Sequence, residues 1–184
     1  MNLRIWLIVG GVAVGGALYF LPKAHVSNEK SQSNTEQVAK ELTSDEVYAH
    51  HFGSLDSLTK QKLSDIDQLM ENAEGAQRDS LLFQKIKIWE KQNDLLMTGI
   101  LFSQLAKSAN DNGPYLLESG TRFLGAMDNA VDSAERIFAA QSALQSLELA
   151  TKADPQNLDY QASFAQAVAL TDPAPLKGVS MLRE

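Results

Sequence analysis

An unbroken run of apolar residues, Ile5 to Leu21, between Arg4 and Pro22, constrains this chain most. At a rise of about 1.5 Å per residue, a helix of this length spans roughly 26 Å, which is close to the thickness of the hydrocarbon core of a bilayer. No other segment is long and apolar enough to cross a membrane. We therefore expect residues 1–23 to be a single transmembrane anchor that crosses the membrane through residues 5–21.

A cleaved secretory signal is the alternative interpretation of the same run. A signal-peptide cleavage site needs small residues in an Ala-x-Ala-like pattern just after the apolar core. Here the core ends in the bulky residues Tyr19 and Phe20, and the charged Lys23 follows shortly after. We favour an uncleaved anchor, because these aromatic residues also fit the interfacial belt of a membrane helix.

The charges beside the run indicate an orientation. Arg4 favours a cytoplasmic N-terminus, whereas Lys23 and Lys30 on the other side weaken that bias. We expect a single-pass protein of the inner (cytoplasmic) membrane, with its soluble domain in the periplasm if the source is a Gram-negative bacterium. Gly11 and Gly15 lie one turn apart and would let another membrane helix approach closely, although glycine is common in membrane helices generally.

The rest of the chain divides by composition into a linker and a domain. Residues 24–42 are polar and cannot bury enough surface to offset the entropy of ordering, so we expect a disordered linker. Residues 43–184 are expected to form one folded domain. The chain carries a net charge of −7 and has no stripe of Lys and Arg to meet phosphates, which argues against nucleic-acid binding.

The domain is predicted to be all-α, because apolar residues recur three and four positions apart between turn signals. Thr43 and Glu46 have the spacing of a capping box and predict a short helix that ends near Gly53. Pro114 predicts the start of a later helix, since proline is favoured in a first turn. Seven antiparallel helices are expected from Ser54 onward. They are a helix over 54–74, one that carries the apolar residues of 81–89, one that carries those of 95–106 and stops at the turn residues 108–113, and helices over 115–127, 128–152, 158–170 and 176–184.

Small and large residues alternate on these helices at a spacing typical of packed helix pairs. The positions are Leu116, Gly120 and Phe123, then Ala143, Leu147 and Ala150, then Pro155 at the turn, then Phe164, Ala165 and Val168. This pattern resembles the tetratricopeptide repeat (TPR), and the arrangement resembles the membrane-anchored TPR proteins of the Bacteroidota. The resemblance implies a TPR-like solenoid of helical hairpins that binds other proteins and has no enzymatic activity.

The chain departs from the repeat in several places. The two helices of the first pair are about eleven residues too far apart for the usual period of 34. Gln161 and Val168 stand where Trp and Tyr are usual, and residues 54–110 match no repeat consensus. The last repeat is incomplete at Glu184, so we expect either a truncated form or a second chain that covers that end.

No set of residues predicts a reaction. Ser57 and Lys60 have the Ser-x-x-Lys spacing of some acyl-enzymes, but no Lys-Thr-Gly or Ser-Asp-Asn motif follows. His50 and His51 are adjacent, so on a helix they point about 100° apart and are poorly placed to share a metal. We therefore predict no catalytic site, no metal and no cofactor. Tyr160 could line a groove for a partner segment, or it could pack in the core.

The expected function is that of a membrane-tethered scaffold or adaptor that binds other proteins, of unknown identity, in a groove on its concave face. Two alternatives stay open. One is an accessory subunit of a membrane complex, which would co-purify in constant ratio. The other is a chaperone-like holdase at the translocon, which would bind many exported chains weakly.

Overall fold

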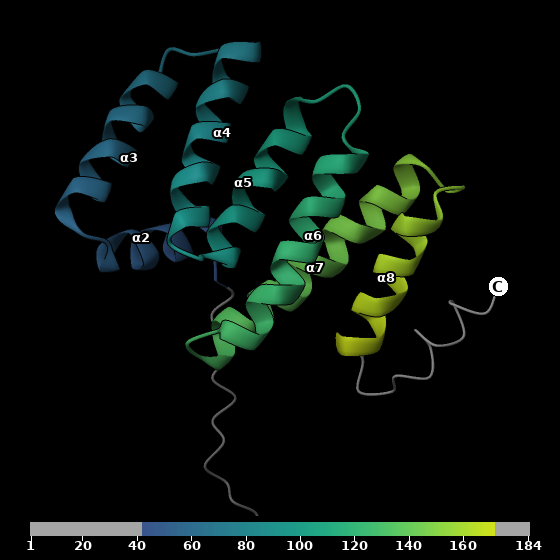
Figure 1. Ribbon diagram of the computed structural model, residues 1–184. Coiled ribbons are helices and arrows are strands. Elements are labelled where there is room, and N and C mark those ends of the chain that lie inside the picture. The colour runs from purple at the N-terminus through teal and green to yellow at the C-terminus, as the bar shows by residue number, and fades with distance from the viewer. Residues whose placement is uncertain (1–41, 172–184) are drawn as a thin grey trace, which may run out of the picture. The chain divides into compact units, whose positions relative to one another are not determined.

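The computed structural model describes residues 42–171, which contain helices joined by turns and loops. Within this range lie seven helices (Figure 1): α2 (Ser44–Ser54), α3 (Ser57–Met70), α4 (Gly75–Lys91), α5 (Leu95–Ser108), α6 (Gly113–Asn129), α7 (Ser133–Ala153) and α8 (Leu158–Thr171). The prediction of an all-α domain is confirmed for these residues.

Several predicted features lie outside the described residues. They are the anchor over 1–23 with Gly11 and Gly15, almost all of the linker over 24–42, and the last predicted helix, 176–184. Among residues 42–171, no helix combines the length and the apolar character needed to span a bilayer.

Side-chain caps define where most helices begin. In the expected capping box of α2, the Thr43 hydroxyl accepts from the Glu46 N–H at 3.3 Å, and the Glu46 carboxylate accepts from the Thr43 N–H at 3.0 Å. Asp56, Asp94 and Asp132 accept from backbone N–H groups at the starts of α3, α5 and α7. Each cap satisfies N–H groups that have no partner inside the helix.

One predicted boundary is wrong. The sequence pattern puts the start of the long fifth helix at Asp128, but α6 continues to Asn129 and α7 begins only at Ser133. The physical reason is the cap, since Asp132 accepts a hydrogen bond from the Glu135 N–H at 2.8 Å. By contrast, Pro114 lies in the first turn of α6, as expected.

From α3 onward, helices that follow one another in the chain are also neighbours in space. The most extensive contacts join α6 to α7 and α5 to α6, and further contacts join α3 to α4, α4 to α5 and α7 to α8. In Figure 1 the helices from α3 to α8 run alternately up and down, while α2 lies across one end of α3, α4 and α5. Contacts between successive helices are the pattern that a helical solenoid requires.

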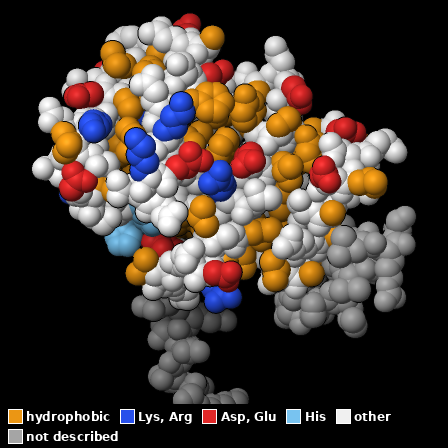
Figure 2. Space-filling model, viewed as in Figure 1, with side chains coloured by type: hydrophobic (Ala, Val, Ile, Leu, Met, Phe, Trp, Pro, Cys, Tyr) orange, Lys and Arg blue, Asp and Glu red, His pale blue; other side chains and the backbone are white. Residues whose placement is uncertain are grey.

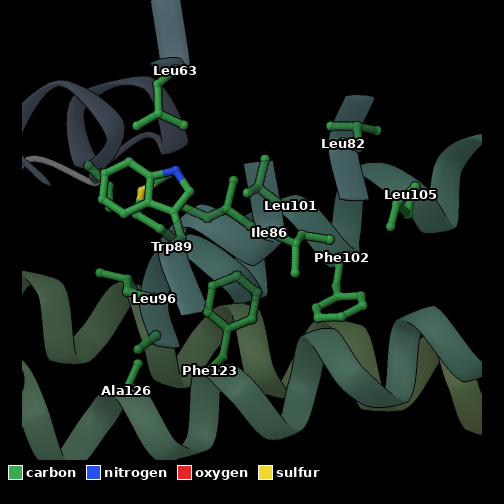
Figure 3. Packing of buried hydrophobic residues seen from close by; sticks show 14 of the residues in the cluster. Leu63, Leu82, Ile86, Trp89, Leu96, Leu101, Phe102, Leu105, Phe123 and Ala126 are labelled. Atoms are coloured by element: carbon green, nitrogen blue, oxygen red, sulfur yellow. The ribbon is translucent and has the colours of Figure 1, made fainter. Parts of the chain in front are cut away.

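The main core surrounds Trp89 of α4, which is completely buried. In Figure 3 its indole ring lies between Leu63 of α3 and Leu96 of α5, with Phe123 of α6 beyond. A second, smaller cluster joins α5, α6, α7 and α8 through Ala106, Leu116, Ala150 and Tyr160. Burial of apolar side chains therefore continues along the stack and ties α8 to the helices before it.

Candidate functional site

A groove of about 600 Å³ lies between α5 and α7, with two residues of α6 at its base. Its lining residues on α7 recur three and four positions apart and so share one side of that helix: Phe138, Ser142, Gln145, Leu149 and Lys152. The opposite wall comes from α5, with Ser103, Ala106 and Lys107. From Phe138 to Lys152 the groove follows α7 for roughly 21 Å.

The base of this groove is apolar and its rim is basic. Leu116 and Phe123 at the base are buried, whereas Lys107 and Lys152 at the rim are exposed. The lining includes no Asp or Glu, although the whole chain has a net charge of −7. Lys152 lies 2.7 Å from Glu148 in an exposed i,i+4 pair, which is worth little in water and breaks readily. The groove therefore has two lysines at its rim and no carboxylate in its lining.

Buried hydroxyl groups hold the helices together beneath the groove. Ser119 Oγ donates to the Gly99 carbonyl at 2.9 Å and lies 3.1 Å from Ser146 Oγ. These contacts link α6 to both α5 and α7, and both serines are buried. Satisfied polar contacts of this kind fix the relative positions of the helices that form the groove.

The predicted packing residues meet where α6 lies against α7. A Cβ added to Gly120 would lie only 2.4 Å from Leu147 Cγ, so the glycine is what allows these helices to approach so closely. Leu147 itself is completely buried. The other packing residues chosen from the repeat pattern on these two helices are buried as well: Leu116, Phe123, Ala143 and Ala150.

The predicted positions beyond α7 differ in their surroundings. Ala165 and Val168 of α8 are buried, and Phe164 is half-buried. Pro155 is exposed in the turn between α7 and α8. Tyr160 is buried in the second core cluster rather than exposed to a partner segment.

The sequence pattern does not reveal a cluster of two histidines and two carboxylates where the ends of α2, α5 and α7 meet. His50 Nδ1 and His51 Nε2 each lie 3.1 Å from Glu135 Oε1, and His51 Nδ1 lies 2.5 Å from Asp94 Oδ2. The histidine side chains were expected to point apart, yet both reach Glu135, because each uses a different ring nitrogen. Histidine surface lies beside an acidic side chain at the lower edge of the face in Figure 2.

The surroundings of this cluster favour positive charge. The side chain of Glu135 is 5% exposed, and those of His51 and Asp94 are each 15% exposed. The hydrogen bond to Asp94 raises the pKa of His51 above its ordinary 6.5, and Glu135 adds to this effect while burial opposes it. His50 is the solvent-facing member, with 64% of its side chain exposed.

Some residues of this cluster could be recognised from the sequence around them, because they occupy helix ends. Asp94 is the cap of α5, Glu135 is an acidic residue in the first turn of α7, and His51 is a basic residue in the last turn of α2, where each charge suits the helix dipole. The meeting of the three helix ends has no local signal, because it joins residues 43 and 84 positions apart.

In the Ser-x-x-Lys motif, Lys60 makes a hydrogen bond that holds the end of one helix rather than one to Ser57. The Lys60 amine donates to the Gly53 carbonyl at 2.7 Å, at the end of α2. Asp56, beside Ser57, caps α3. Neither contact favours an acyl-enzyme site.

No protein-family model, curated protein or solved structure matches this chain.

Proposed function

We propose that this protein is a membrane-tethered scaffold of TPR-like helix pairs, which binds a segment of another protein in the groove between α5 and α7. The observation that carries this proposal is the groove itself, with its buried apolar base and its two exposed lysines. Protein recognition commonly uses this combination, in which apolar anchors enter the groove and polar groups set the orientation.

The dimensions of the groove suit a peptide segment. A length of roughly 21 Å corresponds to a helix of about 14 residues or to an extended segment of about six. Its apolar base would receive side chains that recur on one face of that segment. The hydroxyl and amide groups of the groove would hydrogen-bond to such a segment directly or through bridging waters.

The charge of the groove favours an acidic segment. Lys107 and Lys152 stand at its rim without an acidic residue in the lining. Carboxylates on the partner would pair with these amines, and the exposed pair between Lys152 and Glu148 would exchange one carboxylate for another at little cost. The proposed ligand is therefore a segment in which apolar residues alternate with Asp or Glu.

The tether would act by raising the local concentration of the groove. We infer the anchor from the apolar run over residues 5–21, and the polar stretch over 24–42 would act as a flexible linker. A flexible chain of that length has a root-mean-square span of about 25 Å. The groove would then be held near the membrane, where partners with their own membrane segments reach it at a high effective concentration.

Reversal of the groove charge tests this function. The full chain would carry Lys107→Glu and Lys152→Glu, and a matched control would carry Lys62→Glu and Lys91→Glu, two exposed lysines of α3 and α4 outside the groove lining. Each variant would be purified from its own cells in mild detergent, and the ratio of each co-purifying protein to the chain would be measured by mass spectrometry.

The scaffold predicts one or two partners, whose amounts relative to the chain fall about tenfold or more with the groove variant and stay unchanged with the control. Identical partners in both variants would refute the groove as the binding site. Many weak partners, together with suppressed aggregation of unrelated proteins, would favour a holdase instead. Circular dichroism of both variants would verify that each is folded.

A further inference from the structure

We propose that His50, His51 and Glu135 form a binding site for a divalent transition metal, for which zinc is the best fit. The three residues offer two imidazole nitrogens and one carboxylate oxygen, which all lie within 4.8 Å of one another. They come from two helices far apart in the chain, the last turns of α2 and the first turn of α7. This site is independent of the groove and of the proposed scaffold function.

Two of the three distances between the ligand atoms are close to those of a tetrahedral zinc site, and the third, between the two histidine nitrogens, is no more than 4.8 Å. Zinc binds histidine nitrogen and carboxylate oxygen at about 2.0–2.2 Å, so neighbouring ligand atoms in a tetrahedron lie about 3.3 Å apart. Here His50 Nδ1 and His51 Nε2 each lie 3.1 Å from Glu135 Oε1. Small rotations of the exposed His50 ring would complete the geometry, because its side chain is 64% exposed.

The outer contacts orient the proposed ligands. His51 Nδ1 donates to Asp94 Oδ2, which directs the lone pair of His51 Nε2 toward the proposed metal position. The second oxygen of Glu135 accepts from the Val131 N–H at 3.1 Å, so its first oxygen is left to face both histidines. A carboxylate behind a ligating histidine is the common support of zinc sites.

Without a cation, the same arrangement is poorly satisfied. A carboxylate oxygen can only accept hydrogen bonds, and a neutral His51 that donates through Nδ1 presents a lone pair at Nε2. That lone pair would face Glu135 Oε1 at 3.1 Å. A metal between them would replace this repulsion with two coordination bonds, whereas a proton added to His51 Nε2 would replace it with a hydrogen bond to Glu135.

The donor set selects the class of metal. Two nitrogens and one oxygen suit Zn²⁺ and similar ions, whereas Mg²⁺ and Ca²⁺ prefer oxygen ligands throughout. The fourth position would belong to water, since His50 opens the site to solvent. Binding would link the end of α2 to α7, and through Asp94 to α5, and so fasten α2 to the stack.

The test uses the full chain in mild detergent, stripped of metal with EDTA, which is then removed. Titration calorimetry with Zn²⁺ measures affinity and stoichiometry, and thermal unfolding measures whether Zn²⁺ stabilises the fold. The variants are His50→Ala and His51→Ala, with His25→Ala as a matched control because His25 is the remaining histidine of the chain. His50 is exposed, so its variant keeps the fold even if His51→Ala does not.

The proposed site predicts one Zn²⁺ per chain and a higher unfolding midpoint with zinc. It also predicts a loss of affinity of about tenfold or more in His50→Ala and none in His25→Ala. An unchanged zinc affinity in a folded His50→Ala would overturn the proposal. So would the lack of any one-to-one binding by the unmodified chain, and the cluster would then be a set of ion pairs only.

Discussion

At the scale of single residues, Gly120 is the described glycine with the least room for a side chain. A Cβ there would lie 2.4 Å from Leu147 Cγ, and Leu147 is completely buried. We expect Gly120→Ala to lower the free energy of unfolding by about 1–3 kcal/mol, because overpacking displaces neighbours in a dense core. Urea unfolding followed by circular dichroism measures this change.

Gly53 provides the matched control. A Cβ at this position in α2 would meet no atom within 4 Å. We expect Gly53→Ala to leave the stability unchanged or to raise it by up to about 1 kcal/mol, since alanine is the better helix former. Equal losses in both variants would contradict the role assigned to the close approach of α6 and α7.

His51 is the residue whose protonation should alter stability. Asp94 and, to a lesser degree, Glu135 raise its folded-state pKa above 6.5, the value expected in an unfolded chain. Its stabilising contribution is therefore complete below that value and is lost as the pH rises through the folded-state pKa. In the metal-free protein, the unfolding midpoint should fall over this range, and His51→Gln should flatten the fall. Superimposable pH profiles of the two proteins would exclude this effect.

The structural role of a residue could be predicted where it follows from the spacing of nearby residues. It could not be predicted where it follows from a partner far away in the chain. Gly120 and Leu147 were recognisable because small and large residues at helical spacing imply a close helix pair. Glu135 was not recognisable as the partner of His50 and His51, because no local pattern brings α2 to the start of α7.

At the scale of elements, α2 is attached to α3 and α4 by a small polar network. Tyr48 of α2 donates to Asp67 Oδ2 at 2.8 Å, and Lys85 of α4 donates to Asp67 Oδ1 at 2.6 Å. The Lys85 amine also lies 4.8 Å from the centre of the Tyr48 ring. Burial and the hydrogen bond to Asp67 both raise the pKa of Tyr48, so its hydroxyl remains a donor at neutral pH.

This network predicts unequal costs for its two charged members. Asp67→Ala should lower the free energy of unfolding by about 1–2 kcal/mol, since it leaves the buried Lys85 amine and the Tyr48 hydroxyl without their acceptor. Lys85→Met should cost less, because it removes the buried amine and keeps an apolar chain of similar length. Urea unfolding of both variants checks the order, and a larger loss for Lys85→Met would contradict it.

Most element boundaries could be predicted because they depend on adjacent residues. The Thr43 capping box, the Asp94 cap and Pro114 all mark helix starts that the structure has. The start of α7 was misplaced because Asp128 and Asp132 are both acceptable caps by sequence. Only the hydrogen bond from Glu135 N–H to Asp132 distinguishes them.

At the scale of the whole molecule, the all-α stack was predictable and the position of the groove was not. The order of helices follows from their apolar faces and short turns. The groove forms between α5 and α7, which are separated in the chain by α6, so its walls depend on how three helices cross. Tyr160, for which the sequence left a groove and the core both open, packs in the core.

The most direct test of the central claim is photo-cross-linking from inside the groove, in cells that make the full chain. Gln145, exposed in the groove, would be replaced by a benzoylphenylalanine residue, and Leu58, 60% exposed on α3, would be replaced likewise as the control. The account predicts a discrete adduct with another protein from position 145, lost with Lys107→Glu, and none from position 58. Equal adducts from both positions, or none from position 145, would contradict a scaffold that binds its partner in this groove.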